Sequence, residues 1–195
     1  MSSRDWEAHY AGRDPLAAEP ARVLLDHAHL LPADGYALDL ACGLGANALF
    51  LARHGLRTAA WDASPTAIAA LARAADSAGL SLDAEVRDVI ALPPPVAAFD
   101  VIVVSRFLAR ALSPVLAAAL KPNGLLFYQT FGPPSVDPGR GPRCADFRLA
   151  QGELPRLFPA LELRAYREEG AFGDTKRGLR DEAYAVFSRP GAGLP

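Results

Sequence analysis

A tight glycine turn follows a short apolar run near the start of the chain and leads into a helical pattern. In the segment ALDLACGLGANALFLARHG (residues 37–55), Asp39 lies in the apolar run, and Gly43 and Gly45 stand one residue apart. Glycine removes the side chain that would keep a ligand away from the backbone, and it allows positive φ angles. The helix expected from Ala46 would point its free N–H groups at the turn. The segment therefore predicts a binding site, although two glycines alone also suit an unoccupied strand-to-helix turn.

Two further acids stand where the next two strands are expected to end. Asp62 follows the predicted strand 57–61, and Asp88 with the apolar Val89 follows the predicted strand 82–87. An acid at the first position can accept both ribose hydroxyls of an adenine nucleoside. A carboxylate at the second position can accept the exocyclic amine of adenine while its apolar neighbour packs on the ring. Each acid alone would more often be a solvated strand end, but with the glycine turn they predict one continuous adenosine site.

Alternating strands and helices must position these residues. The periodicity predicts strands at 36–40, 57–61, 82–87, 100–105 and 125–131, helices at 46–54, 64–79 and 113–120, and a turn at 121–124. A proline-rich loop at 132–143, a short helix at 152–158 and two last strands at 161–168 and 182–189 follow. This order predicts a parallel sheet covered on both faces, which binds ligands beyond the carboxyl ends of its strands. We expect a helical cap (1–34), one main domain (35–189) and a short tail (190–195).

The composition excludes several functional classes. The 195 residues are 51% hydrophobic and 22% charged, and the formal net charge of −2 gives no general attraction to nucleic acid or anionic membranes. No stretch approaches the roughly 20 apolar residues of a membrane span, and the charged N-terminus has no apolar signal core. Cys42 and Cys144 form no zinc or redox spacing. We therefore expect a cytoplasmic protein with no metal site that binds neither nucleic acid nor membrane.

The motifs ALDLACGLGANALFLARHG, WDAS, VRDV and FDVIVVSRFL, in this order, resemble those of class I S-adenosylmethionine-dependent methyltransferases over nearly the whole chain. The resemblance implies a Rossmann-like, doubly wound α/β fold, with a mostly parallel seven-stranded sheet, helices on both faces and a last antiparallel strand. It also implies S-adenosylmethionine as the cofactor. Ala41 stands where the family often has another glycine. The cofactor-binding residues that the resemblance implies are Asp39, Ala41, Cys42, Gly43, Leu44, Gly45, Asn47, Asp62, Ala63, Ser64, Asp88, Val89, Ser105 and Arg106.

A dinucleotide-binding enzyme is the weaker alternative. The run GLGANA (residues 43–48) also fits the loose pattern G-x-G-x-x-A. A dehydrogenase normally needs a second domain to hold its substrate, and this chain has no residues left for one. A module that keeps the cofactor pocket without turnover is a further alternative, but neither cap nor pocket looks degraded.

The residues after the fourth strand favour a small-molecule methyl acceptor. SRFL (residues 105–108) replaces the [DN]PP[YF] motif common among enzymes that methylate nucleic-acid bases, and no basic aromatic stripe suggests RNA stacking. The segments RDWEAHYAG and GELPRLFPALELRAYREE resemble parts of the tellurite-resistance and thiopurine-type methyltransferases. That resemblance implies that Trp6 and Tyr10 close over the cofactor and substrate. Phe107 and Arg143 are further candidate substrate contacts.

Cationic side chains indicate the chemistry of the acceptor. Guanidinium groups suit oxyanions. The resemblance to the tellurite-resistance type favours Arg177 and Arg180 for this role, and the family resemblance implies that Arg106 faces the substrate. We therefore expect a chalcogen oxyanion or a thiol as acceptor, methylated by direct in-line transfer without a base. The alternative is an O- or N-methyltransferase of a small metabolite with His9 or a loop residue as the base. The sequence leaves open whether the protein is a monomer or a homodimer.

Overall fold

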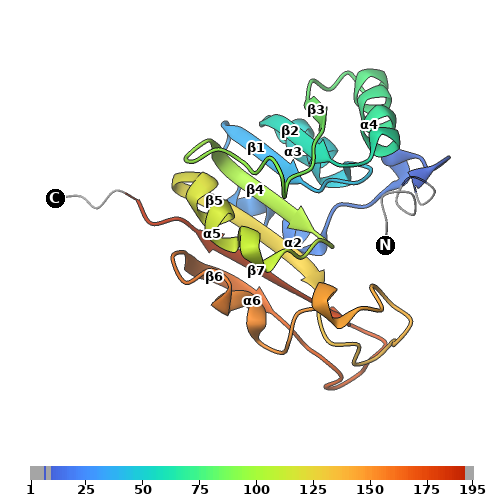
Figure 1. Ribbon diagram of the computed structural model, residues 1–195, viewed down its shortest axis with the longest axis vertical. Helices are drawn as coiled ribbons and strands as arrows, with labels where there is room; N and C mark the ends of the chain where they lie inside the picture. The colour runs from blue at the N-terminus through green and yellow to red at the C-terminus, as the bar shows by residue number, and fades with distance from the viewer. Residues whose placement is uncertain (1–6, 8–9, 192–195) are drawn as a thin grey trace.

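The computed structural model describes residue 7 and residues 10–191, and in this part of the chain one seven-stranded sheet forms the centre (Figure 1). The strand order is β3-β2-β1-β4-β5-β7-β6. β7 runs antiparallel to both β5 and β6, whereas the pairs from β3 to β5 are parallel. The predicted fold class is therefore confirmed. The strands are β1 (Tyr36–Leu40), β2 (Arg57–Asp62), β3 (Asp83–Val86), β4 (Phe99–Ser105), β5 (Leu120–Phe131), β6 (Glu162–Arg167) and β7 (Glu182–Ser188).

Helices cover both faces of the sheet because the central strands are apolar on both sides. Val101 and Val103 of β4 join a buried cluster with α2 and α3, whereas Ile102 and Val104 join a cluster with α5 and α6. Figure 1 shows α4 beside β3, at one end of the sheet. The helices are α2 (Arg22–Asp26), α3 (Ala46–Arg53), α4 (Pro65–Ser77), α5 (Ser113–Ala119) and α6 (Glu153–Arg156), with 3-10 turns η1 (Pro15–Ala17), η2 (Ala28–Leu30), η3 (Arg110–Leu112) and η4 (Ala145–Phe147).

The start and end signals of α4 act as its sequence predicts. The Ser64 hydroxyl accepts a hydrogen bond from Ala67 N at 3.2 Å, and Pro65 occupies the first helical position. Gly79 follows the helix with φ +66°. These local signals place the N-terminus of α4 at the carboxyl end of β2, next to Asp62.

The prediction that a turn at 121–124 precedes the strand is wrong, because these residues lie inside β5. Leu120 pairs with Phe99 and Leu125 pairs with Val101, so the residues between them bulge out of the ladder. Asn123 takes the left-handed conformation that the turn signal predicts, with φ +65°. Its N–H donates to Arg189 O at 3.0 Å, and Arg189 N donates to Gly124 O at 2.8 Å. Pairing with the chain beyond β7 therefore keeps this segment in the sheet.

The segment before β1 crosses the carboxyl edge of the sheet. The side-chain oxygen of Asn47 accepts from Ala21 N at 2.8 Å, and that of Gln129 accepts from Val23 N at 2.9 Å. In the described part of the expected cap, residue 7 and residues 10–34, the helices are short. Trp6 and His9 lie outside the described residues. None of the helices in the part of the chain that the structure describes is long and apolar enough to cross a membrane.

Candidate active site

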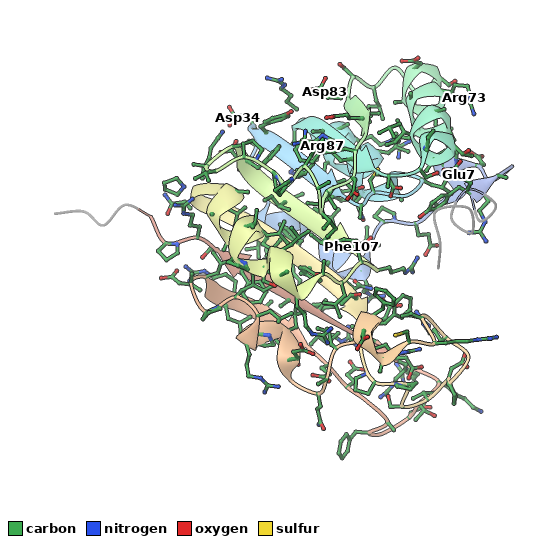
Figure 2. The ribbon with its side chains drawn as sticks, in the orientation of Figure 1. Glu7, Asp34, Arg73, Asp83, Arg87 and Phe107 are labelled. Carbon is green, nitrogen blue, oxygen red and sulfur yellow. The ribbon has the colours of Figure 1, made fainter. Side chains whose placement is uncertain are left out.

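The carboxyl ends of the first four strands meet at one edge of the sheet. Leu40 of β1 pairs with Trp61 of β2 on one side and with Val104 of β4 on the other. The order along the sheet reverses at β1, and this is where open α/β sheets bind ligands. Figure 2 shows Phe107 at the tip of β4 and Glu7 next to α4. The predicted cofactor residues thus lie around one switch point of the topology.

The glycine turn is a left-handed bend packed against α4. Ala41, Gly43 and Gly45 have φ angles of +54°, +54° and +73°. Gly45 N donates to Cys42 O at 2.9 Å and closes the turn. A Cβ on Gly45 would lie 2.4 Å from Leu71 Cδ2, so α4 leaves room only for glycine. Leu44 is half-buried in the same turn.

Asp39 is a fully buried carboxyl group beneath the turn. Its oxygens accept from Asn47 Nδ2 at 3.3 Å and from Ala48 N at 3.0 Å. Burial raises the pKa of Asp39 to about 8, because the interior disfavours the charged form. Asn47 Nδ2 also donates to Ser105 Oγ at 3.1 Å. The structure therefore links Asp39, Asn47 and Ser105 in one buried hydrogen-bond group beneath the turn.

This buried carboxyl makes the protein less stable as the pH rises. Between the pKa of about 4 in the unfolded chain and about 8 in the folded chain, the folded state holds a proton that the unfolded state has lost, so unfolding releases that proton. We expect the wild-type free energy of unfolding to fall, relative to Asp39→Asn, by up to about 1.4 kcal/mol per pH unit in this window. Urea unfolding of both proteins at about pH 5.5 and 7.5, without cofactor, measures the difference. Parallel pH dependences would contradict the assignment of the proton to Asp39.

Asp62 joins the glycine turn to the start of α4. Its Oδ2 accepts from Gly43 N at 2.8 Å and its Oδ1 accepts from Ser64 N at 2.9 Å. Burial raises the pKa of this carboxyl above its ordinary value, and the two N–H donors oppose the shift. Ala63, which lies between Asp62 and Ser64 in the sequence, is exposed at the same edge. A single carboxylate thus sets the spacing between the turn and the helix.

The N-terminal segment lies against this part of the site. A Cβ on Gly43 would lie 2.9 Å from the Tyr10 hydroxyl, so the phenol approaches the turn closely. Burial and the charge of Asp62 raise the pKa of Tyr10, which therefore stays protonated at neutral pH. Thr66 Oγ1 donates to the Glu7 carboxylate, and hydrogen bonds from Ser64 and Thr66 hold the pKa of Glu7 below its ordinary value. Glu7 is thus a contact between the cap and α4 that the motifs did not predict.

Asp88 and Val89 shape the loop that follows β3. Asp88 is exposed, and its Oδ1 accepts from Ile90 N at 2.9 Å and from Ala91 N at 3.2 Å. Val89 is buried in the same cluster as Trp61 and Leu40. Both hydrogen bonds use Oδ1, so Asp88 caps the loop and can still offer its other oxygen to a ligand.

The predicted cationic residues divide between the tip of the central strand β4 and the loops on the β5–β7–β6 side of the sheet. Arg106 follows β4 with φ +54°, is exposed, and donates its backbone N–H to Gln129 O at 2.8 Å. Arg143 and Arg177 are exposed on loops that leave β5 and β6. Arg180 donates to the carbonyls of Arg177, Gly170 and Asp174 at 2.6, 2.7 and 2.9 Å, and so holds the β6–β7 loop together. Arg106 therefore stands nearest in the topology to the glycine turn.

Gln129 is a buried polar residue at this edge that the sequence analysis did not select. Its Oε1 accepts from Val23 N, and its Nε2 donates to Glu182 Oε2 at 2.6 Å. The Glu182 side chain is fully buried and pairs with Arg140 Nη2 at 2.6 Å. This series of hydrogen bonds, which passes through Gln129 and Glu182, connects the cap segment to the loop after β5. The sequence does contain one signal for Gln129, because it is the single amide side chain within the apolar run LLFYQTF, and a buried amide needs hydrogen-bond partners.

The donor set fits an adenosine sulfonium compound. The segment from Asp39 to Gly45 would wrap its methionine end, Asp62 would hold the ribose, and Asp88 with Val89 would hold the adenine. The left-handed turn, whose Gly43 has no side chain and touches Tyr10, lets the backbone approach such a ligand closely. S-adenosylmethionine bound here supplies an activated methyl group.

Comparisons with known proteins point to one family. The family model described as "Methyltransferase domain" matches residues 37–124. The chain is 32% identical over 177 residues to the ubiquinone biosynthesis O-methyltransferase of Methylocella silvestris, covering 76% of this chain and 69% of the relative.

Solved structures of the same fold agree. One, described as "Conversion of a Disulfide Bond into a Thioacetal Group during Echinomycin Biosynthesis", is 25% identical with a TM-score of 0.72 and covers 98% of this chain and 93% of its own. TehB from Haemophilus influenzae is 22% identical with a TM-score of 0.71, over 94% of this chain and 67% of its own. Others, 14–19% identical, are described as S-adenosylmethionine-dependent methyltransferases. The chain belongs to the class I S-adenosylmethionine-dependent methyltransferases.

Proposed function

We propose that this methyltransferase acts on a small molecule whose acceptor atom is a thiolate or another anionic chalcogen, by direct in-line transfer. The sulfonium is a good leaving group, so the protein contributes mainly alignment and exclusion of water. Alignment of this kind can lower a barrier by roughly 7–11 kcal/mol. Such an acceptor needs no general base in the protein, because it reacts as the anion.

The main support for the proposal comes from the types of side chain that lie at the carboxyl ends of the central strands. Among residue 7 and residues 10–191 there are three histidines, and none is a contact of the glycine turn or of Arg106 in the hydrogen bonds found. His27 and His29 border a hollow with Leu125, and the His27 ring lies 5.6 Å from that of Tyr184 in β7. His54 follows α3, before the amino end of β2. Three acidic side chains at the edge, Asp39, Asp62 and Glu182, accept hydrogen bonds from protein groups. Tyr10 is a protonated phenol with a raised pKa.

Arg106 supplies what an anionic acceptor needs. A guanidinium beside the reacting atom favours the ionised acceptor, just as a nearby cation lowers the pKa of a protein thiol. Arg106 is exposed directly after β4, next to Ser105, which belongs to the Asp39 hydrogen-bond group. The proposal gives Phe107 the apolar side of the acceptor space. It gives Arg143 and Arg177 an outer role toward anions, and it gives Arg180 the positioning of the β6–β7 loop.

Replacement of Arg106 tests this assignment. We expect Arg106→Ala to lower kcat/KM for a small thiol by about tenfold to thirtyfold, with Arg106→Lys in between, because a charged hydrogen bond to the acceptor is lost. The rate should also rise at higher pH in Arg106→Ala than in wild type, because the bound thiol has a higher pKa without the nearby cation. Transfer of a labelled methyl group to thiols, sulfide, selenite, tellurite and phenols is the measurement.

The control for this test is Arg73→Ala, an exposed arginine on α4 that lies away from the tip of β4 (Figure 2). It should leave kcat/KM unchanged. Equal rates for Arg106→Ala and wild type with every accepted chalcogen would contradict the proposal.

Oxygen methylation is the second candidate, and the relative named as an O-methyltransferase favours it. A hydroxyl acceptor requires a base, and His9, which the sequence analysis put forward, lies outside the described residues. A phenol preferred over all thiols, with a pH–rate ionisation that disappears in His9→Ala, would favour this candidate.

A further inference from the structure

Arg87 connects the end of β2 to the loop after β3. Its guanidinium carbon lies 4.0 Å from the centroid of the Trp61 ring. Its backbone N–H donates to Asp62 O at 2.8 Å. Trp61 and Asp62 are the last two residues of β2, and Asp62 is the acid at the ribose end of the cofactor site. Arg87 therefore touches the strand end that would hold the ribose with both its backbone and its side chain, and Figure 2 shows it among the strands near β3.

The same guanidinium group also forms hydrogen bonds with the loop that carries Asp88. Nε donates to Leu92 O at 2.8 Å and Nη2 donates to Pro93 O at 3.3 Å. At the other side of this loop, Leu92 N donates to Asp88 O at 2.8 Å. Asp88 thus stands in a small closed turn whose far end is held by Arg87.

Burial of the loop's own apolar side chains cannot replace this contact. Ile90 and Leu92 are 56% and 60% exposed, so they contribute little apolar burial. Val89 is the buried residue of the turn. Ile90 N and Ala91 N orient the Asp88 carboxylate directly. The turn that carries these groups is held at two places, by Val89 in the core and by Arg87 over Trp61.

We propose that Arg87 is a positioning residue that sets the preference of the cofactor site for adenine over other purines. The inference rests on the assignment of the adenosine site to Asp62, Asp88 and Val89. Adenine presents an amine donor to Asp88, whereas hypoxanthine presents a carbonyl oxygen that a carboxylate repels. A site built around a donor rejects the analogue that lacks it, provided that the acceptor is held in place. Arg87 holds that acceptor.

Binding of two cofactor products measures this preference without any turnover. Isothermal titration of wild type with S-adenosylhomocysteine and S-inosylhomocysteine should give dissociation constants that differ by at least about 30-fold. We expect Arg87→Ala to weaken binding of the adenine compound about tenfold and to reduce the ratio to about threefold or less. Arg87→Lys keeps a cation over Trp61 but cannot donate to both carbonyls, so its ratio should lie in between.

Arg57 provides a matched control at the opposite end of the same strands. Its guanidinium carbon lies 4.5 Å from the centroid of the Tyr36 ring, and Arg57 forms an ion pair with Asp83 at 3.5 Å. Arg57→Ala therefore removes a similar cation–π contact from the first residue of β2. Both dissociation constants should stay at their wild-type values.

The outcomes separate this inference from the assignment of the site. Equal weakening of both compounds in Arg87→Ala, with an unchanged ratio, would mean that Arg87 acts only on general stability and would overturn the inference. A wild-type protein without purine preference would also overturn it. If Arg87→Ala does not fold, an unchanged ratio in folded Arg87→Lys has the same meaning. A wild-type protein that binds neither compound would overturn the cofactor site itself.

Discussion

Replacing Asp62 by alanine is expected to raise the dissociation constant of S-adenosylmethionine by at least about 100-fold, because hydrogen bonds to a charged partner contribute about 1.5–3 kcal/mol each. The carboxylate is the proposed acceptor for the ribose hydroxyls. It also accepts from Gly43 N at 2.8 Å and Ser64 N at 2.9 Å. Its removal therefore takes away a ligand contact and loosens the turn that would hold the methionine end. Isothermal titration measures the change, and Asp62→Asn should fall between the two proteins.

Asp100→Ala is the matched control for this loss. Asp100 also accepts a backbone hydrogen bond, from Tyr36 N at 2.8 Å, and it pairs with Lys121 Nζ at 2.6 Å. It stands at the amino end of β4, across the sheet from the proposed site. Asp100→Ala should lower stability while the dissociation constant stays at the wild-type value. Equal affinities for wild type and Asp62→Ala would exclude Asp62 as the ribose ligand.

Gly45→Ala is expected to lower the free energy of unfolding by about 2–5 kcal/mol, from left-handed backbone strain and overpacking together. Gly45 has φ +73°, and an added Cβ would lie 2.4, 2.5 and 2.9 Å from three side-chain carbons of Leu71. Leu71 is fully buried in α4, so it cannot move aside without disturbing the core. Urea unfolding measures the loss, and reduced cofactor affinity should accompany it.

Gly79→Ala separates the two causes. Gly79 has a similar φ of +66°, but no atom lies within 4 Å of the position of its Cβ. This variant should lose only the left-handed strain, about 1 kcal/mol. If Gly45→Ala and Gly79→Ala lose the same free energy, then packing against Leu71 is not what requires glycine in the turn.

Local signals in the sequence determined the elements and their order. Ser64, Pro65 and Gly79 mark the ends of α4, and apolar runs such as DVIVVS predict central parallel strands. Since parallel strands joined by helices end at one edge, this order alone also implies that Asp39 and Asp62 lie near one another. These features depend on neighbours in the chain, and so one sequence suffices to read them.

Only the tertiary structure decided which polar groups satisfy one another. Gln129 meets Val23 N and Glu182, residues that are 106 and 53 positions away, and Arg180 is held by carbonyls of its own loop. Arg87 reaches Trp61 across a strand pair, and Asn123 stays within β5 because Arg189 pairs with it. The physical reason is that a buried hydrogen bond depends on the distance between two groups in space. Spacing along the chain does not contain that distance when the partners come from different elements.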